Sequence, residues 1–358
     1  MINRKIVATC LISSILLTSL TACSSETETP ETEATITAAE TTAETSAQTS
    51  ETTIETTTTE TTLEEPNHVP FVELNGNPDE TFEASELCYT EDDRVIVFFM
   101  KDTCVPQNTL EMLNDFMDDI EETTNLTYDG NPEIERMYDM VTCDFLSDKD
   151  YEGLDMDSKI VIVVTPDNVH ETSYTNACNI QDIDLRDEDF HTIIVHELCH
   201  VNIGVNYGHT TRVLDEGFAV YTTENVFVAN GGHTWDYFQY VAPYEFDETY
   251  ITDGEDGLIR LYKDEGDYYN YGIRFVTFLF DTYGDDVFAD LYDVLKNTDY
   301  SDEIITYTDS STLQNNKAEE IIPYLKEATS EDVFEQFVEW NSSKWPQICS
   351  EYNRSMGL

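Results

Sequence analysis

The chain has 358 residues, and its 17 Lys and Arg against 74 Asp and Glu give a formal net charge of −57 at pH 7. This balance excludes a protein that binds nucleic acid through a basic surface, because such proteins use Lys and Arg to displace the counterions of phosphate. It also excludes charge-driven docking on anionic lipids. Apolar residues nevertheless make up 40%, with 21 Tyr and 17 Phe. That composition favours a folded body over a disordered acidic chain.

The N-terminus has the pattern of an export signal. Arg4 and Lys5 precede an uncharged stretch, residues 6–22, which ends Leu-Thr-Ala just before Cys23. The stretch is short for a transmembrane span and typical of a signal peptide. Its end resembles the lipobox of bacterial lipoproteins. The resemblance implies that residues 1–22 are removed and Cys23 is acylated, so that a lipid anchor alone holds the protein at the cell surface, on the outer face of the cytoplasmic membrane. An uncleaved anchor and cleavage at an ordinary site are the alternatives.

The composition of residues 23–66 predicts a stalk. Positions 24–66 hold 11 Glu, no Asp and no Lys or Arg, and their only large apolar residues are Ile36, Ile54 and Leu63. Such a segment cannot offset its chain entropy by burial, so we expect it to be disordered and extended. Residues 67–358 then carry 63 acids against 15 bases. We interpret this excess as a solvated surface, with attraction of cationic substrates or ions as the alternative.

From residue 67 onward the pattern becomes that of a folded domain. Apolar runs and alternation predict strands at 94–100, 159–164 and 179–185. Helical spacing predicts helices at 109–122, 187–203 and 211–225, and nearly continuous helix after residue 271, ending with 330–340. Strands first and helices last indicate an α+β body. We divide it into a catalytic domain at 67–283 and a mainly helical C-terminal part at 284–358.

The helix at 187–203 contains His196-Glu197-x-x-His200. Four residues turn a helix through about 400°, so both imidazoles project from one face and can bind one Zn²⁺. Glu197 can reach a metal-activated water as general base. A catalytic zinc takes three protein ligands and one open position, so a third ligand is required. A chance occurrence, with two core histidines, is the alternative.

Sixteen positions after His200 the chain reads Glu216-Gly217-Phe218-Ala219. HExxH followed by this second motif resembles the gluzincin metallopeptidases, the thermolysin-like and aminopeptidase-like group. The resemblance implies a zincin-like catalytic domain with a mixed sheet and Glu216 as the third ligand of a single Zn²⁺. The neighbouring Asp215 is the rival ligand. Gly217 and Ala219 are small, so we expect their helix to pack closely on the zinc helix.

A third match is Tyr269-x-x-Gly272, which resembles the start of a later helix in aminopeptidase-like gluzincins. The resemblance implies that Tyr269 donates a hydrogen bond to the oxyanion, with Tyr271 as the alternative. The metzincin pattern requires Gly three and His six residues after the second His, where this chain has Ile203 and Asn206. We therefore expect neither His191 nor His209 to be a ligand.

These residues predict a zinc metallopeptidase acting on peptides or proteins. No aminopeptidase signature precedes His196, and in this group a strand placed like 179–185 binds extended substrate, so we expect an endopeptidase rather than an aminopeptidase. The alternatives are a catalytically silent zinc-containing surface protein and a zinc hydrolase of non-peptide substrates. An intact Glu197 favours catalysis. The substrate and the oligomeric state stay open.

The body contains six cysteines at positions that form no CxxC pair, which makes a thiolate metal cluster improbable on spacing. An even number in an oxidising compartment allows up to three disulfides, in 15 possible pairings. Free buried thiols are the alternative. The six are Cys88, Cys104, Cys143, Cys178, Cys199 and Cys349.

Overall fold

The computed structural model describes residues 69–130 except 75, 158–166, 179–207, 211–230, 246–295 except 265, and 318–356, with a few single residues between these ranges. All of them belong to one compact unit. The predicted signal peptide, Cys23 and all of the predicted stalk lie outside the described residues. Within the described ranges, no helix combines the length and apolar character that crossing a membrane requires.

A four-stranded mixed sheet supports the N-terminal half of this unit, in the order β2-β3-β5-β6. β2 (Cys88–Glu91) pairs antiparallel with β3 (Val95–Phe99). β3 is parallel to β5 (Ile160–Thr165), which is parallel to β6 (Asn179–Gln181). A separate antiparallel pair joins two strands of three residues, β1 (Thr81–Glu83) and β4 (Cys104–Pro106). The predicted α+β class is confirmed, and the predicted strands at 94–100 and 159–164 are present.

The two central strands are buried on both faces. Because side chains alternate along a strand, Val97 and Ile162 enter the large core shared with the helices. Phe98 and Val163 enter a smaller cluster on the opposite face. The sheet is therefore an interior element, which explains why β3 and β5 are continuous apolar runs rather than alternating ones.

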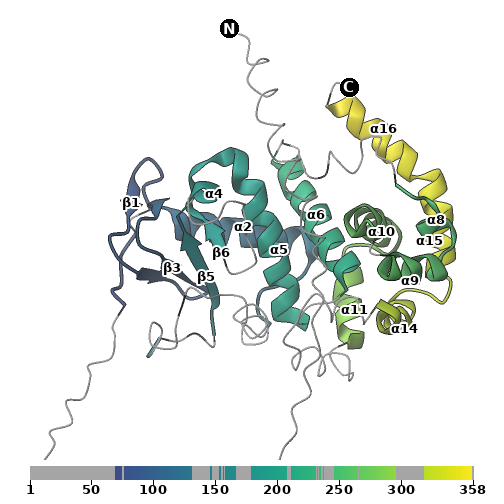
Figure 1. Ribbon diagram of the computed structural model, residues 1–358, viewed down its shortest axis with the longest axis horizontal. Coiled ribbons are helices and arrows are strands. Elements are labelled where there is room, and N and C mark those ends of the chain that lie inside the picture. The colour runs from purple at the N-terminus through teal and green to yellow at the C-terminus, as the bar shows by residue number, and fades with distance from the viewer. Residues whose placement is uncertain are drawn as a thin grey trace, which may run out of the picture. The chain divides into compact units, whose positions relative to one another are not determined.

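The helices make up most of the remaining structure (Figure 1). Four of them follow or lie between the strands in the chain, and the third of these four packs against the other three. The predicted helices at 109–122, 187–203, 211–225 and 330–340 are present, with ends shifted by a few residues. A further helix after residue 343 was not predicted, and residues 296–317 lie outside the described ranges. The first group is α2 (Thr109–Thr124), α4 (Asp182–Arg186), α5 (His191–Tyr207) and α6 (Arg212–Ala229), with a short 3₁₀ turn, η1 (Glu188–Phe190), before α5. The later group is α8 (Thr249–Thr252), α9 (Glu255–Lys263), α10 (Tyr268–Tyr283), α11 (Val287–Leu295), α14 (Ala318–Ala328), α15 (Val333–Ser343) and α16 (Trp345–Ser355).

The predicted half-exposed strand at 179–185 is wrong. Only Asn179–Gln181 forms a strand, and all three residues are buried. A helix begins at Asp182 because the carboxylate of Asp184 accepts a hydrogen bond of 3.1 Å from the backbone N–H of Gln181, as in a capping box. The Asp182 carboxylate accepts the N–H of Cys104 at 2.7 Å. The polar residues of the alternating pattern are therefore buried and hydrogen-bonded, not exposed to solvent or substrate.

Gly217 sets the distance between α6 and α10 rather than between α6 and the helix with the HExxH motif. A Cβ atom on Gly217 would lie 2.5 Å from the backbone of Gly272, and one on Gly272 would lie 2.4 Å from the carbonyl oxygen of Val213. The two glycines thus permit the backbones of α6 and α10 to touch, which side chains would prevent. We expected Gly217 to face the helix with the HExxH motif, but it faces α10 instead. α6 does also pack on α5.

Candidate metal centre

The HExxH residues lie in the middle of α5, a helix whose other residues are largely apolar. Ile194, Val195, Leu198 and Val201 have no exposed surface. Burial of these side chains fixes the rotation of α5 and leaves His196 and His200 on the remaining face. Their ring centroids lie 4.9 Å apart, and the Nε2 atoms are separated by 3.2 Å. Two ring nitrogens therefore converge on one point, as the four-residue spacing predicts.

The third member of the cluster comes from α6. Oε2 of Glu216 lies 3.6 Å from Nε2 of His196 and 3.6 Å from Nε2 of His200. The three side chains are partly buried, and one ligand atom from each lies within 4.8 Å of the others. The rival Asp215 is buried and is not a member of this cluster. Of the two carboxylates predicted as alternatives, the structure brings Glu216 to the histidines.

Charge and burial oppose one another in this cluster. Burial by itself lowers the pKa of His200, but Glu216, Glu197 and Asp215 outweigh it and raise the pKa to about 9. Burial by itself raises the pKa of Glu216, but His196 and His200 hold that pKa well below its usual range. Without a metal, the site therefore holds an ionised carboxylate beside a protonated imidazole at neutral pH.

The geometry fits a tetrahedral zinc ion. Ligand atoms bound at 2.0–2.1 Å in a tetrahedron lie about 3.3 Å apart, close to the 3.2 and 3.6 Å observed. A distance of 3.6 Å is too long for a hydrogen bond. Oε2 of Glu216 is accordingly buried with no hydrogen-bond partner among the described residues. An orphaned buried carboxylate oxygen facing two imidazoles is a donor set suited to Zn²⁺.

No protein-family model, curated protein or solved structure matches this chain. The chemistry of the site must therefore be inferred from its own residues. Two histidines and one carboxylate would hold a tetrahedral ion with one position open, as in catalytic rather than structural zinc sites.

Two further predicted residues, Glu197 and Tyr269, border this cluster. Glu197 is half-buried in α5, and its charge contributes to the raised pKa of His200. Tyr269 is half-buried at the start of α10. Burial and then Glu216 raise the pKa of Tyr269 well above its ordinary value, while Arg212 acts in the opposite direction. The Tyr269 hydroxyl is therefore protonated at neutral pH and lies beside the third predicted ligand.

The alternative Tyr271 belongs to the core. It has no exposed surface, and its ring packs against Phe275 and Phe337. His191 lies outside the cluster, with Nε2 3.4 Å from the carbonyl oxygen of Leu185. His209 and Cys23 lie outside the described residues. The structure thus separates Tyr269 from Tyr271, which the sequence alone could not do.

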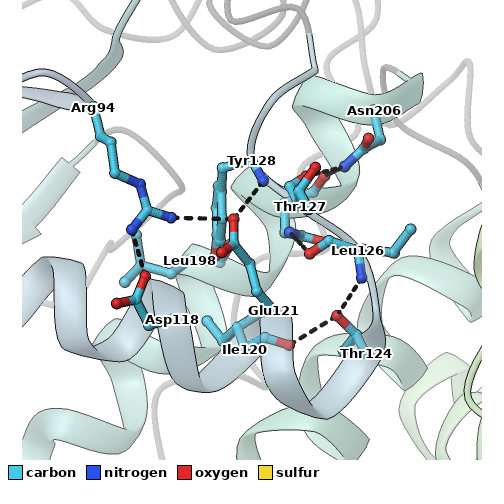
Figure 2. Close-up of polar contacts among 11 residues, drawn as sticks. Arg94, Asp118, Ile120, Glu121, Thr124, Leu126, Thr127, Tyr128, Leu198 and Asn206 are labelled. Carbon is cyan, nitrogen blue, oxygen red and sulfur yellow. Dashed lines mark hydrogen bonds and ion pairs between the residues drawn. The ribbon is translucent and has the colours of Figure 1, made fainter.

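A polar brace behind the metal helix has no counterpart among the sequence predictions (Figure 2). Tyr128 donates a hydrogen bond of 2.8 Å to the carbonyl oxygen of Leu198, and Asn202 donates one of 3.1 Å to the carbonyl oxygen of Leu126. At 100° per residue, positions 198 and 202 point away from the two histidines. We call residues 124–130 the brace segment. It holds the back of α5 while the front carries the cluster.

The brace segment is itself tied to α2 and to the sheet. Glu121 accepts the backbone N–H of Tyr128 at 2.8 Å and pairs with Arg94, which also pairs with Asp118 (Figure 2). Gly130 touches α5 so closely that a Cβ would lie 2.0 Å from the carbonyl oxygen of Val205. The brace segment therefore contacts the back of α5 at Leu198, Asn202 and Val205, over two turns of the helix.

The described cysteines form no disulfide. Cys88, Cys104, Cys199 and Cys349 are all free. Burial, aided by Glu86, raises the pKa of Cys88 to about 11, so its thiol is protonated and unreactive at neutral pH. The possibility of three bridges is wrong. The alternative of free buried thiols is confirmed for Cys88 and Cys199, while Cys104 and Cys349 are free and only partly buried. Cys143 and Cys178 lie outside the described residues.

Proposed function

We propose that this protein is a zinc-dependent peptidase of the gluzincin type. The observation that carries the proposal is the convergence of Glu216, from a second helix, on Nε2 of His196 and of His200 at 3.6 Å each. A chance HExxH sequence would not require a carboxylate from α6 at that point. A zincin-like fold is part of the same proposal, supported by the mixed sheet, the HExxH helix and the adjoining α6.

The residues of the chain divide the work of amide hydrolysis. Zinc held by His196, His200 and Glu216 would act as a Lewis acid that makes water and the substrate carbonyl more reactive. Glu197 accepts the proton of the attacking water as general base and passes it to the leaving amine. Tyr269 donates a hydrogen bond to the carbonyl oxygen as negative charge develops on it. The raised pKa of Tyr269 suits this role, because the proton stays on the hydroxyl.

We propose cleavage within chains rather than removal of N-terminal residues. One ground for that expectation, an exposed substrate-binding strand at 179–185, is removed because those residues are buried as a short strand and a helix. The ground that stays is the missing aminopeptidase signature before His196. Substrate therefore has to be aligned by groups other than that strand.

The proposal also includes the place of action. The signal-like residues 1–22, the lipobox-like end at Cys23 and the acidic stalk sequence support an enzyme anchored by lipid at the bacterial cell surface. Mass spectrometry of the membrane fraction tests this part, because diacylation at Cys23 and loss of residues 1–22 change the mass of the N-terminal peptide. An intact N-terminus at residue 1 would contradict it.

Metal analysis combined with digestion of a broad peptide library tests the activity. We expect about one zinc per chain, cleavage by the wild type, and no cleavage by Glu197→Gln with zinc still bound. Zinc without any cleavage would favour a silent zinc-containing surface protein. Zinc with cleavage only of non-peptide esters or amides would favour a zinc hydrolase of non-peptide substrates. A Glu197→Gln variant as active as the wild type would refute the mechanism.

A further inference from the structure

Arg212 is the first residue of α6 and lies one turn before Glu216. Its Nε is 3.8 Å from Oε1 of Glu216, the oxygen that does not face the histidines. Its side chain is 40% exposed, whereas that of Glu216 is 15% exposed. The guanidinium therefore extends from the edge of the cluster toward solvent.

The ring of Tyr268 holds this guanidinium in place, and a second tyrosine lies near it. Its central carbon lies 5.1 Å from the centroid of the Tyr268 ring, a cation–π distance. Tyr269, the predicted oxyanion donor, lies close enough for the guanidinium to lower its pKa, against the larger effects of burial and Glu216. Stacking fixes the plane of an arginine and leaves its edge free to bind. A guanidinium carries five N–H groups, and the contacts that the structure gives for this one are its ion pair with Glu216 at 3.8 Å and its stacking on Tyr268. Among the described residues, these contacts leave N–H groups on its exposed part without a hydrogen-bond partner.

The charge of the protein makes a cation at this position notable. The chain carries a net charge of −57, and Arg212 is the one Lys or Arg that pairs with a member of the cluster among the described residues. Orienting Glu216 requires only the Nε side of the guanidinium. The exposed N–H groups are suited to a planar anion, since arginine binds carboxylates with two parallel hydrogen bonds.

We propose that Arg212 is a specificity-determining residue and that its exposed N–H groups bind a carboxylate of the substrate close to the bond that is cleaved. The inference rests on the proposed function and adds the substrate class to it. The carboxylate comes from the C-terminus of a short peptide or from an Asp or Glu side chain, and both sources present the same group to Arg212. A substrate carboxylate bound to Arg212 would also help to align the substrate, because the largely buried residues 179–185 cannot do so.

Binding of small zinc chelators tests the inference without any turnover. The probes are the monohydroxamates of malonic, succinic and glutaric acid, each compared with the analogue whose carboxylate is a primary amide. For the zinc-loaded wild type we expect the best carboxylate probe to bind about tenfold or more tightly than its amide, as a charge-assisted hydrogen bond predicts. In Arg212→Gln the ratio should fall close to one.

Arg260→Gln is the matched control. Like Arg212, Arg260 is partly exposed, at 38%, and stacks on a tyrosine ring at 5.1 Å. Unlike Arg212, it forms its ion pairs with Asp253 and Asp264, outside the cluster. We expect this variant to keep the wild-type ratio. Arg212→Lys, which keeps the charge and loses the planar fork, should give a reduced ratio and serves if Arg212→Gln fails to fold. An unchanged ratio in the Arg212 variants, or a wild-type ratio of one, overturns the inference.

Peptides then identify the source of the carboxylate. The two peptides of one pair have a free and an amidated C-terminus, and those of a second pair have Glu and Gln next to the cleaved bond. The source of the carboxylate is the pair whose difference in cleavage rate disappears in Arg212→Gln. A protein that cleaves peptides but shows a hydroxamate ratio of one refutes the inference alone. A protein that shows the ratio but cleaves no peptide refutes the proposed hydrolysis alone. A protein that binds no zinc refutes both.

Discussion

Tyr128 donates a hydrogen bond of 2.8 Å to the carbonyl oxygen of Leu198, which lies in the turn of α5 between His196 and His200. The hydroxyl is buried, so its loss leaves a backbone acceptor with one partner fewer. This contact links the brace segment to the helix that carries two predicted zinc ligands (Figure 2). It shows that the site depends on residues about 70 positions away in sequence.

Tyr128→Phe should lower the free energy of unfolding by about 1 kcal/mol, because it removes one buried hydrogen bond and no apolar surface. Urea denaturation of the metal-free protein measures this change. Tyr250→Phe is the matched control, since its hydroxyl makes an exposed contact of 3.3 Å to Asp264. We expect that variant to change stability by less than about 0.5 kcal/mol. Equal effects of the two substitutions would contradict the brace.

Gly217→Ala should destabilise the protein by about 1–3 kcal/mol, because the new methyl group would lie 2.5 Å from the backbone of Gly272. Alanine in a helix interior normally stabilises by about 1 kcal/mol, so the sign of the change is decisive. The nearest atom to a Cβ on Gly232 is 3.4 Å away, which makes Gly232→Ala the control. A more stable Gly217→Ala protein would show that α6 and α10 do not touch.

Zinc affinity should rise with pH up to about 9. The pKa of His200 is raised to about 9, so below that pH zinc has to displace a proton, whereas Glu216 is already ionised. The apparent dissociation constant should fall about tenfold per pH unit between pH 7 and 8, with release of about one proton. Calorimetry in buffers of different ionisation enthalpy measures the release. Binding without proton release would contradict the His200–Glu216 pair.

Thiol labelling tests the state of the cysteines. Burial raises the pKa of Cys88 to about 11 and that of Cys199 further, so both should react slowly with iodoacetamide in the native protein at pH 7. In denaturant without reductant, at least four thiols should be labelled, because Cys88, Cys104, Cys199 and Cys349 are free. Labelling of these four only after reduction would show that they are bridged.

The sequence predicted the convergence of His196, His200 and Glu216 better than the structure around them. His196 and His200 follow from local helix geometry, and Glu216 follows from a motif on the next helix. The prediction for residues 179–185 was wrong because an alternation of apolar and polar residues can have two causes. Here the polar residues Asp182 and Asp184 face backbone N–H groups inside the protein, and alternation cannot distinguish that environment from solvent.

Arg212 and Tyr128 lay beyond prediction for a different reason. Arg212 precedes Glu216 by four residues. This spacing indicates an ion pair on any helix, but it does not predict that the carboxylate faces two histidines. Tyr128 meets Leu198 across 70 residues, and its acceptor is a backbone oxygen that every residue possesses. Likewise, the sequence indicated that Gly217 allows a close helix contact. It could not identify Gly272 as the partner, because that contact depends on how α10 packs.

Anomalous scattering at the zinc edge from crystals grown with Zn²⁺ tests whether the three side chains bind zinc. We expect one strong peak about 2.0–2.1 Å from Nε2 of His196, Nε2 of His200 and Oε2 of Glu216. Glu216→Ala crystals should lose or greatly weaken that peak, while Glu197→Gln crystals should retain it. A peak that does not contact all three side chains, or no peak at zinc concentrations that saturate other zinc peptidases, would contradict the account.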